Sequence, residues 1–113
     1  MTTLKLQICR AQGAQPYFWR IVSGTDILAR SETMFNKADA VKAANQMRYY
    51  TSEYQFEVIN TTDRLRPYSW HAQAKNSRLV VSSTDLYGIY TQAYGAMEYV
   101  RTNVPYGDIE DLT

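Results

Sequence analysis

The sequence predicts an α+β fold in which two tandem β-β-β-α repeats share an antiparallel sheet with two helices packed on it. The main observation is an internal repeat, because Pro16-Tyr17-Phe18-Trp19 returns as Pro67-Tyr68-Ser69-Trp70. The second observation is that each copy shows strand-like alternation followed by helical periodicity. The later correspondences are residues 27–32 with 79–84, Phe35 with Tyr87, Ala40 with Ala93, and Met47-Arg48 with Val100-Arg101.

Three strands and a helix are expected in the first copy. Residues 4–8 alternate apolar and polar side chains, the pattern of a half-buried strand, and residues 11–16 break it. In the next strand Tyr17, Trp19 and Ile21 share one face, so Arg20 lies on the other. Residues 23–26 have hairpin-turn chemistry and residues 27–30 form a short third strand.

The first helix is expected over residues 37–49, with Asn36 as its N-cap. Its apolar positions recur at the spacing of one helix face, and the small alanines suggest close packing on a sheet. These positions are Ala40, Ala43, Ala44 and Met47.

The second copy repeats the plan with different residues. Strands are expected over residues 55–59, 68–74 and 79–82, with a hairpin turn at 75–78. Thr91 is the expected cap of a helix that ends near residues 103–105. Its buried face would be formed by Ala93, Ala96, Met97 and Val100.

The chain is expected to form a single domain over residues 1–113, since this length is near the commonest domain size. Repeat one covers about residues 4–50, repeat two about 54–103, and an acidic tail 104–113. The few residues between the copies are too short to be an interdomain linker, so the copies should share one core. The tail is expected to be solvated, as terminal charge runs usually are.

The amino-acid composition argues against several classes of binding partner and against a bound metal. The net charge of +1 provides no long-range field for nucleic acid or an anionic membrane, so neither is an expected partner. A single cysteine, Cys9, cannot form an internal disulfide, and no long apolar run or signal-like start is present. These features favour a soluble, cytoplasmic protein. One cysteine and one histidine also argue against zinc, and we expect neither metal nor cofactor.

The residues of the repeat resemble the YegP-like family of small tandem-repeat proteins, known mainly as a domain of unknown function. The family's repeat has an aromatic strand, an Ile-Leu-x-x-Ser-Glu-like strand, an aromatic residue, a turn lysine and a helix ending in Val-Arg. In the first copy these elements are residues 17–20, residues 27–32, Phe35, Lys37 and Met47-Arg48. The second copy lacks the turn lysine, and the family's helix glycine is replaced by Ala43 and Ala96.

This resemblance implies an α+β fold in which two β3-α units, in tandem or from two chains, build a common antiparallel sheet. It implies no established activity, cofactor or catalytic residue. The family spans bacteria, archaea and their viruses, so a phage origin is compatible with it.

An enzyme is the disfavoured alternative. His71 is the only side chain whose ordinary pKa lies near neutral pH, but the repeat aligns it with Arg20, which indicates a polar surface position. The segment 82–85 supplies hydroxyls and a carboxylate, but capping a helix explains its composition more simply. We therefore expect no catalytic residues.

The expected function is a small non-enzymatic binding module that engages a protein partner or forms a homodimer. Ten tyrosines are the compositional outlier, and exposed tyrosines beside arginines suit a partner surface. The alternative is a protein that sequesters a small anionic ligand, such as a nucleotide, in a cleft between the repeats. The candidate binding residues for the two hypotheses are Arg20, His71, Arg48, Tyr49, Tyr50 and Arg101.

Overall fold

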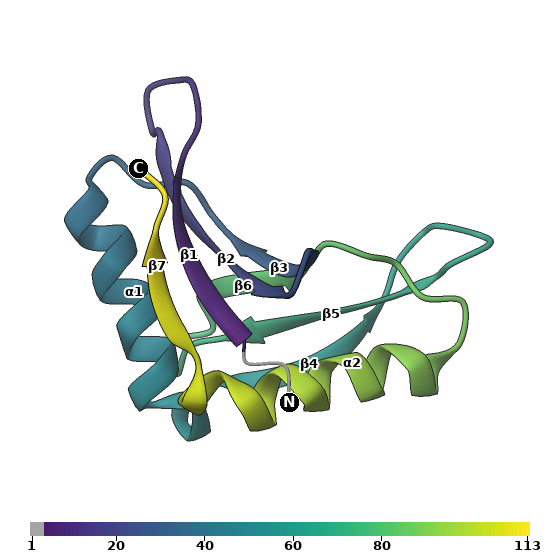
Figure 1. Ribbon diagram of the computed structural model, residues 1–113. Coiled ribbons are helices and arrows are strands. Elements are labelled where there is room, and N and C mark those ends of the chain that lie inside the picture. The colour runs from purple at the N-terminus through teal and green to yellow at the C-terminus, as the bar shows by residue number, and fades with distance from the viewer. Residues whose placement is uncertain (1–3) are drawn as a thin grey trace.

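The computed structural model describes residues 4–113 as an α+β protein with a seven-stranded mixed sheet and two helices on one of its faces (Figure 1). The strands lie in the order β4-β5-β6-β3-β2-β1-β7. Helix α1 packs against β1 and β2, and α2 packs against β4 and β5. The elements are β1 Leu4–Arg10, β2 Tyr17–Ser23, β3 Asp26–Ser31, α1 Lys37–Tyr49, β4 Gln55–Asn60, β5 Tyr68–Gln73, β6 Leu79–Ser83, α2 Tyr90–Asn103 and β7 Asp108–Asp111, with short 3-10 turns at Thr51–Glu53 and Val104–Tyr106.

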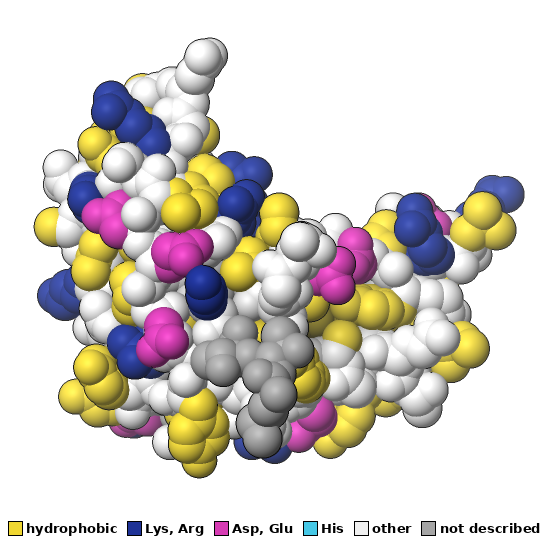
Figure 2. All heavy atoms as spheres, viewed as in Figure 1, with side chains coloured by type: hydrophobic (Ala, Val, Ile, Leu, Met, Phe, Trp, Pro, Cys, Tyr) yellow, Lys and Arg dark blue, Asp and Glu magenta, His cyan; other side chains and the backbone are white. Residues whose placement is uncertain are grey.

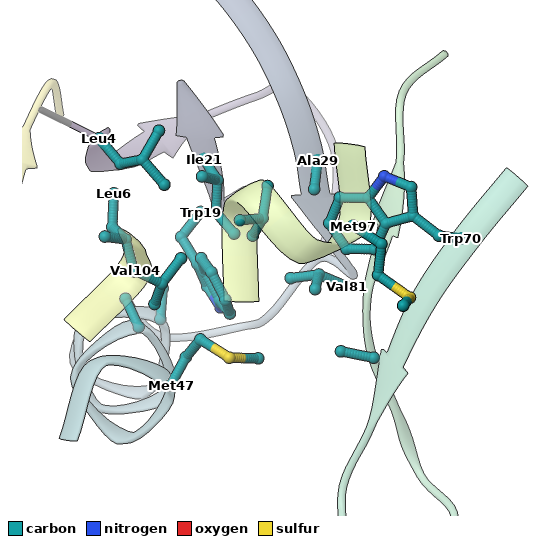
Figure 3. Close-up of a cluster of buried hydrophobic side chains, with 14 of the residues drawn as sticks. Leu4, Leu6, Trp19, Ile21, Ala29, Met47, Trp70, Val81, Met97 and Val104 are labelled. Atoms are coloured by element: carbon teal, nitrogen blue, oxygen red, sulfur yellow. The ribbon is translucent and has the colours of Figure 1, made fainter. Parts of the chain in front are cut away.

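The core lies between the helices and the face of the sheet that they cover. Strand alternation sends Leu6, Ile8 and Ile21 to this face, where all three are fully buried. Trp19 and Trp70 are the largest side chains in the core, and each has 0% of its surface exposed (Figure 3). The helices contribute their small or flexible apolar residues, namely Ala40, Ala44 and Met47 from α1 and Ala93, Met97 and Val100 from α2.

The two tryptophan strands are held in matching ways. The backbone N–H of Trp19 donates to Ser31 Oγ at 2.9 Å, and that of Trp70 donates to Ser83 Oγ at 3.2 Å. Ser31, at the end of β3, thereby binds the start of β2, and Ser83, at the end of β6, binds the start of β5.

One pairing within the sequence repeat is wrong. Tyr17 forms an isolated bridge with Met34, as Tyr68 does with Tyr87. Met34, and not Phe35, therefore occupies the place of Tyr87, and Phe35 is 65% exposed. The reason is that the extra residue of the second copy lies before this aromatic position, where sequence alignment cannot locate it.

The start of α1 agrees with expectation, whereas α2 starts two residues earlier than expected. Helix α1 begins at Lys37 after Asn36, as predicted, although the Asn36 amide contacts Asp39 at 3.4 Å and caps no backbone N–H. Helix α2 begins at Tyr90 with Ile89 in the N-cap position, two residues before the expected cap Thr91. Among residues 4–113, neither helix has the length and apolar character needed to cross a membrane.

The sheet is mixed, which corrects the expectation of a wholly antiparallel one. Six strands pair antiparallel with their neighbours, but β7 pairs parallel to β1, with Leu6 opposite Ile109 and Gln7 opposite Glu110. The segment expected as a solvated acidic tail therefore contains an edge strand. Its acidic side chains have partners that the charge count did not reveal: Lys5 lies 3.0 Å from Glu110, and Lys37 lies 2.5 Å from Asp111.

The attachment of β7 should weaken in acid. Hydrogen bonds from Lys37 and Thr113 lower the pKa of Asp111 from its ordinary 3.8 to about 2. A carboxylate whose pKa is lower in the folded than in the unfolded state stabilises the fold at pH values above its ordinary pKa. This stabilisation is lost as the pH falls from about 4 towards about 2. Urea unfolding as a function of pH measures this loss. Asp111→Asn should give a shallower decline below pH ~4, and identical declines in the two proteins would contradict the assignment.

Candidate functional site

A row of polar side chains crosses all seven strands on the sheet face that carries no helix. Because Trp19 and Ile21 point into the core, Arg20 between them points to the opposite face. Cross-strand register then places one residue of every strand in line with Arg20. This open-face row consists, in strand order, of Glu57, His71, Ser82, Arg30, Arg20, Gln7 and Glu110.

Hydrogen bonds fix both ends of the open-face row. At one end Lys5 binds Glu110, Gln7 Nε2 donates to Glu110 Oε1 at 2.7 Å, and Arg20 Nε donates to Gln7 Oε1 at 2.8 Å. At the other end His71 Nε2 lies 2.6 Å from Glu57 Oε1. The carboxylates stand at the two edges of the sheet and the arginines near its centre.

The centre of the row is cationic. Arg20 and Arg30 are direct cross-strand partners, and among the described residues neither forms an ion pair. The Arg30 guanidinium stacks over the Phe18 ring, 4.0 Å from its centroid. Burial raises the pKa of the neighbouring Cys9 thiol, and the positive charges of Arg20 and Arg30 oppose that rise.

A shallow hollow of about 350 Å³ lies over β3 and β6 at this centre. Arg30, Glu32, Ser82 and Thr84 are among the side chains that line it. In Figure 2 the molecular surface is concave between two projecting arms, which Figure 1 identifies as the β1–β2 and β4–β5 loops.

The sequence-predicted binding residues fall into two groups. Arg20 and His71 lie in one row, separated by Arg30 and Ser82 on the intervening strands. Arg48 and Arg101 lie on the helices, which cover the other face of the sheet. The structure therefore does not bring these four residues into one cleft.

The helix-borne candidates have local partners. Arg48 donates to Asn45 Oδ1 at 3.2 Å and lies 5.4 Å from the centroid of the Tyr49 ring. Arg101 forms an ion pair with Glu98 at 2.5 Å. Tyr49 and Tyr50 are exposed where α1 ends. These candidate residues therefore lie at the C-terminal ends of the two helices and already contact side chains of their own helix.

A second surface is aromatic and lies at the start of α2. Tyr90 stacks on Tyr94 with the ring centroids 6.3 Å apart and meets Tyr68 edge-on at 5.8 Å. We call these three tyrosines the aromatic patch; the exposed Ile89 directly precedes Tyr90 in the chain. The four-residue spacing of Tyr90 and Tyr94 was the signal in the sequence for this stacked pair.

The two edges of the sheet differ. One edge is β7, a four-residue strand with three carboxylates, the short charged kind of edge that discourages further pairing. The other edge is β4, whose sequence Gln-Phe-Glu-Val-Ile-Asn has a single charged residue, Glu57. Among residues 4–113 no strand covers the outer side of β4.

The structure is a small two-layer α+β protein. Two solution NMR structures match nearly the whole chain. The UPF0339 protein of Shewanella oneidensis has a TM-score of 0.76 and 16% identity, covering 98% of this chain and 92% of that one. The E. coli protein yegP, described as a protein of unknown function, has a TM-score of 0.70 and 16% identity, covering 99% and 93%.

These matches confirm, at the level of the fold, the resemblance seen in the sequence. No family model matches the chain, and no curated protein matches it. Neither solved structure has an enzymatic name. In the described part of the chain, no three His, Cys, Asp or Glu side chains are grouped so that they could hold a metal ion.

Proposed function

We propose that the protein is a non-enzymatic binding module that takes an extended segment of a protein partner onto the free edge of β4. The observation that carries the proposal is the contrast between two edges: β1 is covered by β7 of the same chain, and β4 is uncovered. Addition of a strand to an exposed edge is a recurrent mode of peptide recognition, with affinity from backbone hydrogen bonds and specificity from alternate side chains.

Residues 4–50 and 54–103 are, in this proposal, tandem repeats related by a pseudo-twofold axis. The sequence repeat aligns Arg30 with Ser82, and these two residues pair directly across β3 and β6. Moving outward from that pair, Arg20 corresponds to His71 and Gln7 to Glu57. The matched tryptophan–serine hydrogen bonds support the same relation.

The pairing of β7 with β1 is then an internal example of the proposed mode. Ile109 packs against the core cluster, and Glu110 binds Lys5 and Gln7 on the open face. Asp111 binds Lys37, the first residue of α1. A segment on β4 would meet the corresponding positions of the second repeat.

The side chains at these positions of the second repeat favour a segment whose sequence differs from that of β7. Glu57 stands where β1 has Gln7, so a basic residue is favoured where β7 has Glu110. Tyr90, the first residue of α2, stands where α1 has Lys37, so an apolar or aromatic residue is favoured where β7 has Asp111. The aromatic patch would then extend the docking surface beyond the strand.

The same charges disfavour a second copy of this chain as the occupant. The β7 strand of another copy would bring Glu110 towards Glu57, and two like charges facing each other across strands are destabilising. An antiparallel pair of β4 strands would likewise bring two copies of Glu57 to one interface. We therefore assign the edge to a heterologous partner with alternating apolar and basic residues.

A charge-reversal experiment tests this proposal. Two peptides that resemble the β7 segment serve as probes, Gly-Ser-Ile-Lys-Tyr-Leu and Gly-Ser-Ile-Glu-Tyr-Leu, and binding is followed through the backbone amide NMR signals of β4. The natural protein should prefer the lysine peptide by roughly three- to fivefold, because a cross-strand charge pair contributes up to about 1 kcal/mol. In Glu57→Lys the preference should reverse.

Asp26→Lys is the matched control, since Asp26 is exposed in the β2–β3 hairpin and forms no ion pair among the described residues. It makes the same change of net charge away from β4 and should keep the natural preference. Binding by neither peptide, or an equal change of preference in both variants, would contradict docking at β4. Sedimentation that reveals a dimer broken by Glu57→Lys would assign the edge to self-association instead.

A further inference from the structure

We propose that the centre of the open-face row is a binding site for a small tetrahedral oxyanion, such as the phosphate group of a phosphate monoester. The site consists of the guanidinium groups of Arg20 and Arg30 and the hydroxyl of Ser82, on three neighbouring strands. It lies on the sheet face, separate from the β4 edge, and does not depend on the proposed strand addition.

The two arginines form an unbalanced pair of charges. Arg20 and Arg30 face each other across β2 and β3, where like charges are destabilising unless a counter-charge lies between them. The carboxylates of the row, Glu57 and Glu110, lie at the opposite edge strands and bind other groups. A dianion between the two guanidinium groups would balance both charges at once.

Both arginines are also held in position in advance. Arg20 uses Nε to bind Gln7, and Gln7 is itself held by Glu110. Its terminal nitrogens form no hydrogen bond within residues 4–113. The Arg30 guanidinium carbon lies over the Phe18 ring, 4.0 Å from its centroid, and its N–H groups form no hydrogen bond within residues 4–113. Guanidinium groups fixed in this way lose little conformational entropy when they bind phosphate in a bidentate manner.

Space for the anion lies beside Arg30, whose cross-strand partner is Arg20. The hollow of about 350 Å³ is open to solvent and adjoins Arg30 and Ser82. Ser82 lies opposite Arg30 on one side and His71 on the other, and its hydroxyl has no partner among the described residues. It could therefore supply a donor to a third oxygen, which a tetrahedral anion has and a carboxylate does not.

The carboxylate of Glu32 should oppose the binding of an anion, which gives the proposal a second test. Glu32 lines the same hollow, two residues along the chain from Arg30. It forms no ion pair within the described residues, so its charge is not neutralised by a neighbour. Removing that charge should strengthen anion binding, whereas removing either arginine should weaken it.

The test is an amide NMR titration of the full chain with inorganic phosphate, with sodium chloride adjusted to keep the ionic strength constant. Saturable shifts are expected at Gln7, Arg20, Arg30 and Ser82. Arg20→Gln and Arg30→Gln should each weaken binding at least about tenfold, since a hydrogen bond to a charged group contributes roughly 1.5 kcal/mol or more. Glu32→Gln should strengthen it about twofold, as expected for a charge at the solvent-exposed rim.

Lys42→Gln is the control, because Lys42 is an exposed residue of α1 on the other side of the sheet and its loss changes the net charge by the same amount as the loss of an arginine. It should leave the affinity unchanged. Acetate, with one charge and two oxygens, should bind far more weakly than phosphate. Equal weakening by Lys42→Gln and Arg30→Gln, unsaturable shifts, or equal affinity for acetate would each overturn the proposal.

Discussion

Replacing either Trp19 or Trp70 with alanine is expected to destabilise the protein by about 3–5 kcal/mol. Both indoles are completely buried, and each lies on the core face of the central strand of its half. Alanine would leave a large cavity between the sheet and the helices, which a packed core fills only in part. Urea unfolding followed by far-ultraviolet circular dichroism measures the free energy of unfolding of each variant.

Two further variants make this result interpretable. Trp19→Phe should cost much less than Trp19→Ala, because the aromatic bulk is kept and the indole N–H has no hydrogen-bond partner among the described residues. Tyr106→Ala, at a side chain that is 78% exposed, should change stability by less than about 0.5 kcal/mol. A strongly unequal cost at Trp19 and Trp70 would contradict their equivalence in one shared core.

Gly107→Ala is expected to destabilise the protein by about 1–3 kcal/mol through overpacking. A Cβ atom at this position would lie 2.8 Å from the carbonyl oxygen of Leu4 and 3.0 Å from Leu6 Cδ1. Leu4 and Leu6 belong to β1, so the clash would push β7 away from the edge that it covers. Urea unfolding measures the loss, and hydrogen exchange should show faster exchange of the backbone amides of β7 and of the β1 amides that bond to it.

Gly95→Ala is the matched control, and its effect should have the opposite sign. Gly95 lies within α2 and a Cβ there would meet no atom within 4 Å. Alanine is more favourable than glycine in a helix interior by about 0.8–1.0 kcal/mol, so this variant should be more stable than the natural protein. Equal stability of Gly107→Ala and the natural protein would mean that β7 does not depend on the close approach at Gly107.

The elements that the sequence predicted well were those with strong local periodicity. Apolar alternation located β1 and β2, and the alanine spacing located α1 with its first residue at Lys37. The two tryptophans that the sequence repeat aligns are both completely buried, as expected for large aromatic side chains on the apolar face of a strand.

The role of the C-terminal segment was not predictable in the same way. Its residues, including Asp108, Glu110 and Asp111, are typical of a solvated terminus, and only Ile109 gives a weak strand signal. The partners that make it a strand, Lys5 and Lys37, are distant in sequence. Parallel pairing with β1 is a tertiary effect, and local patterns contain no information on it.

The candidate site was predicted in part for a related reason. The alignment of Arg20 with His71 identified two members of the open-face row from strand alternation alone. Arg30 was not singled out, and Ser82 was considered only as part of the segment 82–85, because the place of both in the row depends on the pairing of β3 with β6, which joins the two halves. Arg48 and Arg101 were grouped with Arg20 and His71 because the repeat places each pair in corresponding positions, but the sheet lies between the two sets.

The most direct test of the free-edge proposal is hydrogen exchange of the full chain with and without the peptide Gly-Ser-Ile-Lys-Tyr-Leu. We predict that backbone amides of β4, Gln55–Asn60, gain protection when the peptide is bound, and that those of β1, already covered by β7, do not change. Protection of β1 with no change in β4, or no protection of either strand at saturating peptide, would contradict the assignment of β4 as the partner-binding edge.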